Sequence, residues 1–214
     1  MTHTETVWLF DLDNTLHHAD AGIFRLINRA MTDYLADSLN LPHRKASQLR
    51  EDYWHRYGAT LAGLRLHHPE IDIMAFLRAS HPMPQLLAAL QPMPDTAKTL
   101  SALSGRKAVF SNGPSFYVDG LLRALRLDTF FERSFGTDTF GLLYKPNPQA
   151  YLEVCRQWSV APQQCVMVDD SAANLRTAKD LGMMTVWFGK GAHKLPFVDY
   201  AAADMRELAA FKAV

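Results

Sequence analysis

Residues 6–13 read TVWLFDLD, an apolar run that leads directly into two aspartates, Asp11 and Asp13. The run is rich in β-branched and aromatic residues and does not alternate with polar ones, which is typical of a strand covered on both faces. Three further segments have the same character: KAVFSNG (107–113), CVMVDDS (165–171) and MTVWFG (184–189). Together they predict a parallel sheet whose strands end in polar or small residues.

Helical patterns alternate with these strands from about residue 90 onward. Because helical crossovers join parallel strands, we predict an α/β fold, an open parallel Rossmann-like sheet with helices on both faces. Between residues 20 and 90 every pattern is helical, which indicates an all-helical cap subdomain inserted after the first strand. We therefore predict a core domain formed by residues 1–16 and 91–214 and a cap formed by residues 17–90.

The composition narrows the possible partners and location. The 214 residues include 22 Lys+Arg and 22 Asp+Glu, so the bulk charge favours neither nucleic acid nor an anionic membrane. No signal peptide and no apolar stretch of roughly 18 residues is evident, and we expect a cytoplasmic protein, a monomer or a homodimer. Cys155 and Cys165 have neither a disulfide pattern nor a metal spacing, so both are expected to be buried and reduced.

Polar side chains follow three of the predicted strands. They are Asp11 and Asp13, then Ser111 and Asn112, and finally Asp169 and Asp170. In an open parallel sheet, such residues meet at the edge where the strands end. Four carboxylates at one edge raise one another's pKa unless a cation lies among them, and a hard divalent ion with oxygen ligands fits best. The pattern predicts a Mg²⁺ site.

Four motifs in this order, DLDNTL (11–16), SNG (111–113), KPNP (145–148) and VDDS (168–171), resemble those of the haloacid dehalogenase superfamily, and the helical insert resembles its C1-type cap. The resemblance implies that Asp11 is the nucleophile and forms an aspartyl-phosphate. It implies that Asp13 is the general acid and base, with its backbone carbonyl on the metal. Dehalogenating members lack an aspartate at this position, so Asp13 indicates phosphate esters as substrates.

The same resemblance assigns the phosphate and metal ligands. Ser111 would bind a phosphoryl oxygen through its hydroxyl, helped by the backbone N–H groups of Asn112 and Gly113. Lys145 would stabilise the equatorial oxygens and Asp11. The implied metal ligands are Asp11, Asp13, Asp169 and Asp170, with Asp170 the better ligand of the last pair and Asp169 binding directly or through water. Some members carry a further acid where this chain has Asn174.

A narrower resemblance concerns the substrate. FDLDNTLHHADAGIFRLINRAMTDYL (10–35) and YWHRYGATLAGL (53–64) are similar to the pyrimidine 5′-nucleotidase branch, whose members usually show Tyr-Pro after NTL and YGTTLRGL in the cap. Four residues are predicted to shape a nucleoside pocket: His17, Tyr53, Tyr57 and Thr60. The alternative interpretation is that the aromatic residues pack between cap helices.

These observations lead to three functional hypotheses. The first is a Mg²⁺-dependent phosphomonoesterase that acts on small phosphate esters, specifically pyrimidine nucleoside 5′-monophosphates. The second is a sugar-phosphate or phosphoglycolate phosphatase with the same chemistry. The third is a catalytically idle module that only binds phosphate, and the presence of every catalytic residue type argues against it.

Overall fold

The structure, a computed structural model, describes residues 5–211 and contains one sheet of six parallel strands in the order β3-β2-β1-β4-β5-β6. The strands are β1 (Val7–Phe10), β2 (Arg106–Phe110), β3 (Arg133–Phe135), β4 (Cys165–Asp169), β5 (Met184–Phe188) and β6 (Tyr200–Ala202). This is the order of a doubly wound Rossmann sheet. The predicted fold class is confirmed.

The register of the central strands brings their ends to one edge. Phe10 at the end of β1 is level with Val109 of β2 and Val168 of β4. The backbone N–H of Asp11 extends this ladder by donating to the carbonyl of Val168 at 2.9 Å. The residues that follow β1, β2 and β4 therefore emerge side by side.

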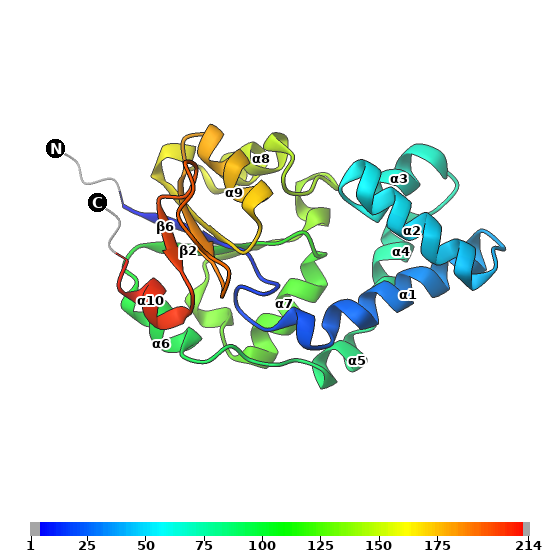
Figure 1. Ribbon diagram of the computed structural model, residues 1–214, viewed down its shortest axis with the longest axis horizontal. Helices are drawn as coiled ribbons and strands as arrows, with labels where there is room; N and C mark the ends of the chain where they lie inside the picture. The colour runs from blue at the N-terminus through cyan, green and yellow to red at the C-terminus, as the bar shows by residue number, and fades with distance from the viewer. Residues whose placement is uncertain (1–4, 212–214) are drawn as a thin grey trace. The chain divides into compact units, whose positions relative to one another are not determined.

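Helices cover both faces of the sheet. They are α6 (Thr96–Ala102), α7 (Ser115–Leu125), α8 (Pro148–Trp158), α9 (Ala172–Asp180) and α10 (Met205–Ala209). Leu9 and Phe110 belong to one core cluster with Tyr151 of α8 and Leu175 of α9. On the opposite face lie α6 and α10, where the hydroxyl of Thr99 donates to the carbonyl of Met205 at 2.8 Å (Figure 1).

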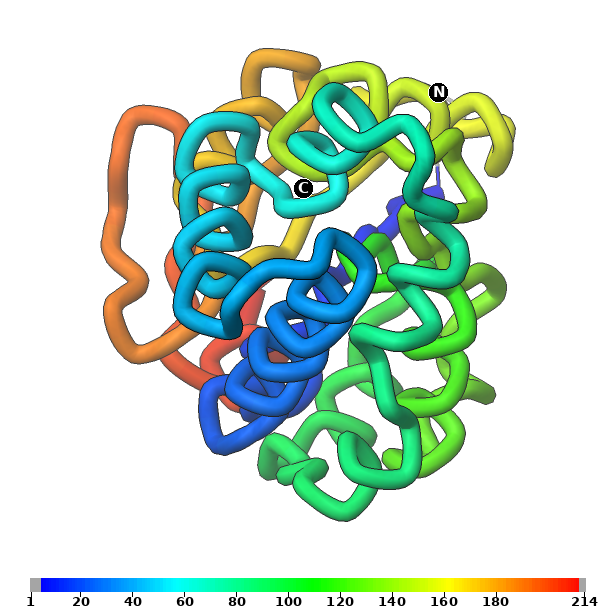
Figure 2. Tube along the Cα trace, turned by 90° about the vertical axis from the view of Figure 1, so that its right-hand side faces the viewer, coloured from blue at the N-terminus to red at the C-terminus, as the bar shows by residue number. Residues whose placement is uncertain are grey.

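A second compact unit contains only helices. The chain divides into a sheet unit, formed up to His18 and from Gln91 onward, and a helical unit, Ala19–Leu90. The helical unit comprises a 3-10 turn (Ala19–Ala21), α1 (Ile23–Ser38), α2 (His43–Tyr57), α3 (Thr60–His67), α4 (Ile73–Ser80) and α5 (Met83–Ala88). Within it, α1 packs against α2 and α4, and α2 packs against α3 (Figure 2).

The first boundary of the helical unit falls after His18 rather than after Leu16, so His17 belongs to the sheet unit. The reason is local pairing of the backbone. His17 forms isolated β-bridges with Asp13 and with Pro92, and the N–H of His18 donates to the carbonyl of Gln91 at 3.0 Å. The outgoing and returning segments are thus tied together next to the sheet.

Two further expectations concern burial and membranes. Cys155 and Cys165 are both free and buried, as predicted. None of the helices within residues 5–211 has both the length and the apolar character that a membrane span requires.

Candidate active site

Asp11 stands immediately after β1, with its carboxylate almost buried. Its Oδ1 accepts a hydrogen bond from the ammonium of Lys145 at 2.8 Å, and its Oδ2 accepts one from the hydroxyl of Thr15 at 3.4 Å. Burial is the largest influence on Asp11 and raises its pKa well above the ordinary value; Lys145 opposes the rise, and neighbouring aspartates add to it. The positive charge of Lys145 therefore does not fully offset the effects of burial and of the neighbouring aspartates on Asp11.

Lys145 is buried between two carboxylates. Its ammonium donates to Asp11 and also to Oδ2 of Asp169 at 2.7 Å, and only 1% of its side chain is exposed. Burial alone would lower the pKa of Lys145, but the two carboxylates outweigh it and raise the pKa above its usual value. The ammonium is held in its charged form.

Asn112 positions Lys145 through its side chain. The amide nitrogen of Asn112 donates to the carbonyl of Lys145 at 2.9 Å, and its amide oxygen accepts the N–H of Lys145 at 2.7 Å. The sequence indicated a phosphate contact through the backbone of Asn112. The side chain adds a role that the sequence did not suggest, because it fixes the backbone from which the ammonium extends.

Asp169 ends β4 and Asp170 follows it, but their surroundings differ. The fully buried carboxylate of Asp169 accepts hydrogen bonds from Lys145, from the amide of Asn174 at 3.0 and 3.1 Å, and from the N–H of Ser171 at 2.8 Å. Its oxygens are therefore already engaged by three donor residues. Asp169 therefore binds the ammonium of Lys145 and holds it in place.

Asp170 is partly exposed and has fewer partners. Burial and the charge of Asp169 raise the pKa of Asp170 to about 6, while Lys145 and a hydrogen bond from the side chain of Asn14 act in the other direction. Its backbone carbonyl accepts the indole N–H of Trp187 at 3.0 Å. This arrangement fixes the backbone and leaves the carboxylate directed at the site.

Ser111 lies at the end of β2 and is completely buried. Its hydroxyl oxygen accepts the N–H of Gly113 at 3.0 Å. This N–H is engaged by Ser111 in the structure, and its contact with phosphate stays a prediction. Glycine is required at position 113 for another reason: an added Cβ would lie 2.6 Å from the ring of Tyr117.

Asp13 faces two donors from different segments. Its Oδ1 lies 3.0 Å from Nε2 of His17, and the same oxygen accepts a short hydrogen bond from the hydroxyl of Tyr117. Burial and the neighbouring Asp13 raise the pKa of Tyr117 well above its ordinary value, so the hydroxyl keeps its proton. His17 was predicted to shape a nucleoside pocket, whereas its side chain is fully buried against Asp13.

The charge balance of the site fits a hard cation. Ligand atoms of Asp11, Asp169 and Asp170 all lie within 4.8 Å of one another. Asp13 lies nearby and Lys145 pairs with only two of these carboxylates. Burial first, and the neighbouring aspartates second, raise the pKa values of Asp11 and Asp170. An oxygen-only ligand set with excess negative charge suits a divalent ion such as Mg²⁺.

The predicted pocket residues of the helical unit have partners within that unit. The hydroxyl of Tyr53 lies 2.9 Å from Nε2 of His68, and that of Tyr57 lies 2.6 Å from Nε2 of His67. Thr60 donates to the carbonyl of Arg50 at 3.2 Å. The structure brings Tyr53 and Tyr57 together, with ring centroids 5.9 Å apart, as packing of the helical unit.

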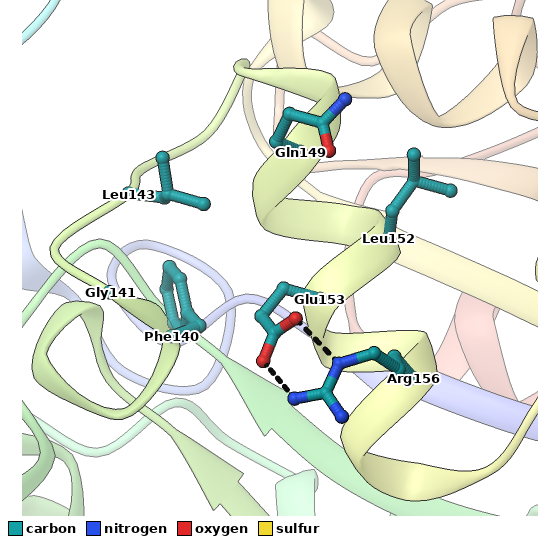
Figure 3. Close-up of a pocket in the computed structure, with 7 residues that line it drawn as sticks. All are labelled: Phe140, Gly141, Leu143, Gln149, Leu152, Glu153 and Arg156. Carbon is teal, nitrogen blue, oxygen red and sulfur yellow. Dashed lines mark hydrogen bonds and ion pairs between the residues drawn. The ribbon is translucent and has the colours of Figure 1, made fainter.

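A cavity of about 360 Å³ lies elsewhere on the sheet unit (Figure 3). It is lined by Phe140, Gly141, Leu143, Gln149, Leu152, Glu153 and Arg156. The ion pair between Glu153 and Arg156 spans 2.6 Å on its surface. Because none of the predicted catalytic residues lines it, this cavity is distinct from the carboxylate site.

Three contributors to the site were not assigned from the sequence. Asn14 lies within the quoted DLDNTL stretch, and its side chain reaches Asp170. Asn174 was noted only as a departure from an acid, yet it binds both oxygens of Asp169. Tyr117 belongs to an apolar helical pattern and carries no signal of its own, although its spacing from SNG places it in the first turn of the following helix.

Comparison with known proteins agrees with this geometry. The family model described as haloacid dehalogenase-like hydrolase matches residues 6–182. The match spans the central strands and every strand-end residue discussed above.

Curated relatives carry phosphatase names. A phosphoglycolate phosphatase of Pseudomonas putida is 26% identical over 190 residues, covering 83% of this chain and 67% of that protein. A glyceraldehyde 3-phosphate phosphatase of Methanocaldococcus jannaschii is 26% identical over 217 residues, covering 94% and 93%. A crystal structure of a HAD phosphatase from Thermococcus onnurineus has a TM-score of 0.69 at 23% identity, covers 96% of each chain, and supports the fold.

Proposed function

The chain belongs to the haloacid dehalogenase-like hydrolases, and on that premise we propose that it hydrolyses small phosphate monoesters through an aspartyl-phosphate on Asp11. One observation carries the proposal. The carboxylate of Asp11 lies at the end of the central strand, 2.8 Å from a buried ammonium and beside two further aspartates. A buried nucleophile with an anion-stabilising partner is the arrangement that phosphoryl transfer needs.

The protein residues divide the chemistry among them. Asp11 attacks phosphorus, and Asp13 delivers a proton to the leaving oxygen and later takes one from the attacking water. Lys145 stabilises the charge on the phosphoryl oxygens, and the hydroxyl of Ser111 binds one of them. Asn112 and Asp169 hold the two ends of Lys145, so its ammonium needs little reorganisation during the reaction.

We assign Mg²⁺ to the same site. Asp11, Asp170 and the backbone carbonyl of Asp13 would hold it, and Asp169 would act through Lys145 because its oxygens are already engaged. When bound, the ion supplies positive charge that offsets the carboxylates and the transferring phosphoryl group.

For the substrate, we favour phosphorylated sugars or small hydroxy acids over pyrimidine nucleotides. The relatives named phosphoglycolate and glyceraldehyde 3-phosphate phosphatase support this class. The nucleotidase hypothesis rested on residues 10–35 and 53–64, and this chain departs from that branch in both stretches. The hydroxyls of Tyr53 and Tyr57 also have partners in the helical unit.

A substrate panel tests the proposal. Phosphate release is measured for phosphoglycolate, sugar phosphates, uridine and cytidine monophosphates and p-nitrophenyl phosphate, with Mg²⁺ and with EDTA. We expect the first two groups to turn over fastest and EDTA to abolish activity. Faster turnover of the pyrimidine nucleotides would reverse the substrate preference.

The Asp11→Asn variant tests the nucleophile. We expect phosphate release to fall by about 10⁴-fold or more on every substrate, because the amide cannot form the covalent intermediate. An unchanged rate would refute the role of Asp11. Phosphate binding by the wild-type protein without any turnover would support the idle-module hypothesis instead.

A further inference from the structure

The carboxylate of Asp13 is held by one of its two oxygens. Oδ1 is the oxygen that meets both the imidazole of His17, at 3.0 Å, and the hydroxyl of Tyr117. Both side chains are fully buried, and the side chain of Asp13 is 17% exposed. Two donors on Oδ1 fix the orientation of the carboxylate, and neither of them contacts Oδ2.

His17 has no second polar contact that would explain its burial. Within the described part of the chain, its Nδ1 is buried without a hydrogen-bond partner. Because Oδ1 of Asp13 accepts, Nε2 carries the hydrogen and Nδ1 is left as a bare acceptor. A hydrocarbon side chain would fill the same space without burying an unpaired nitrogen. The bond to Asp13 is therefore the contact that favours histidine here.

The two donors are themselves fixed by the fold. The backbone of His17 bridges to Asp13 and to Pro92, which sets the direction of its side chain. The ring of Tyr117 packs against Gly113, where an added Cβ would lie 2.6 Å from it. Both donors therefore extend from closely packed segments.

We propose that His17 and Tyr117 are positioning residues that orient Asp13 so that Oδ2 alone exchanges a proton with the substrate. This inference rests on the proposed function. As the bond from Asp11 to phosphorus forms and the ester P–O bond breaks, the leaving oxygen takes the proton from Oδ2. In the second step water attacks phosphorus, the bond to Asp11 breaks, and Oδ2 recovers a proton from that water.

The test compares two leaving groups. An alkyl phosphate such as glycerol phosphate needs a proton on its leaving oxygen, whereas p-nitrophenyl phosphate releases a stable anion and needs it far less. The measured quantity is kcat/KM, because it reports the steps up to departure of the leaving group. His17→Leu removes the donor, and His17→Gln keeps a donor near the position of Nε2.

We expect His17→Leu to lower kcat/KM for the alkyl phosphate by about 10- to 100-fold more than for p-nitrophenyl phosphate. His17→Gln should recover most of the difference. Tyr117→Phe keeps the ring against Gly113 and removes only the hydroxyl, so it should change the ratio in the same direction. His18→Gln, at the exposed neighbouring histidine, serves as the matched control and should leave the ratio unchanged.

Other results would overturn the inference. Equal losses on both esters, or a change confined to KM, would mean that these residues support folding or substrate binding rather than Asp13. If His17→Leu fails to fold, as judged by its thermal melt, Tyr117→Phe alone decides. If the wild-type protein hydrolyses neither ester, the proposed function fails; if it hydrolyses both and the ratio is unchanged in the folded variants, only the positioning role fails.

Discussion

The carboxyl edge of the sheet and the helical unit handle polar side chains in opposite ways. At the sheet edge, the ammonium of Lys145 pairs with Asp11 and Asp169. Burial and the charge of Asp169 raise the pKa of the nearby Asp170 to about 6. In the helical unit, polar side chains form hydrogen bonds with neighbouring side chains. The partly exposed guanidinium of Arg50, for example, donates to Thr32, Asn28 and Glu51.

This difference in polar pairing distinguishes a candidate site from polar groups that only stabilise packing. Complete pairing stabilises the helical unit and leaves its polar groups little capacity for a ligand. The unbalanced negative charge at the sheet edge opposes folding, and a bound cation would reduce it. Electrostatic imbalance in buried groups, more than the number of polar residues, distinguishes the candidate site here.

Of the substitutions considered, replacing Lys145 should have the largest effect on stability and turnover. Lys145→Met keeps the volume but leaves Asp11 and Asp169 without their counter-ion. We expect the free energy of unfolding to fall by about 3–5 kcal/mol and turnover to fall by about 10³-fold. Urea unfolding in EDTA and phosphate release measure the two effects.

Lys179→Met is the matched control. Its ammonium lies 2.6 Å from Asp199 but is 37% exposed, so its loss should change the free energy of unfolding by less than about 1 kcal/mol. If both lysine variants unfold alike, burial of the ion pair at the sheet edge has little energetic effect and the comparison fails.

The helical unit is tested through its packing. Gly63→Ala places a Cβ 2.2 Å from the ring of Tyr53. Although alanine favours a helix, overpacking should lower the free energy of unfolding by about 1–3 kcal/mol. Gly191→Ala, where the added Cβ meets nothing within 4 Å, is the control and should be near neutral. A Gly63→Ala variant as stable as wild type would contradict the tight contact between α2 and α3.

The pH dependence of stability tests the charge at the sheet edge through a smaller effect. The folded-state pKa of Asp170 is raised to about 6, so the folded protein binds more protons than the unfolded chain between about pH 4 and pH 6. The contribution of Asp170 to stability is therefore present below this window and is lost as the pH rises through 6. Bound Mg²⁺ should remove the loss, because it favours the ionised carboxylate.

Thermal melts of wild type and Asp170→Asn measure this contribution. In EDTA, raising the pH from 4 to 7 should lower the melting temperature of the wild type by a few degrees more than that of the variant. Mg²⁺ should raise the melting temperature of the wild type at pH 7 and have less effect on Asp170→Asn. Identical pH profiles in EDTA would show that Asp170 carries no electrostatic strain.

Much of the sheet could be predicted because its inner strands are continuous apolar runs. The segments that contain β1, β2, β4 and β5 were all identified. The two edge strands were missed, since β3 and β6 have three residues each and are covered less completely than the inner strands. Short strands of that kind carry no hydrophobic period.

The candidate site divides along a similar line. Asp11, Asp169 and Asp170 lie at the ends of apolar strands, so their proximity could be inferred from topology alone. His17 was assigned to the helical insert because the sequence does not reveal its bridges to Asp13 and Pro92. The contact of Tyr117 with Asp13 joins residues 104 positions apart, and only the fold brings them together.

Trapping the covalent intermediate tests the central claim most directly. The wild-type enzyme is quenched during turnover of p-nitrophenyl phosphate in Mg²⁺ and reduced with borohydride, which converts an aspartyl-phosphate to homoserine, and the peptides are sequenced by mass spectrometry. We predict homoserine at position 11 and at no other aspartate, with none in a sample reduced without substrate. Homoserine at another position, or none during active turnover, would contradict the role of Asp11 as the phosphoryl acceptor.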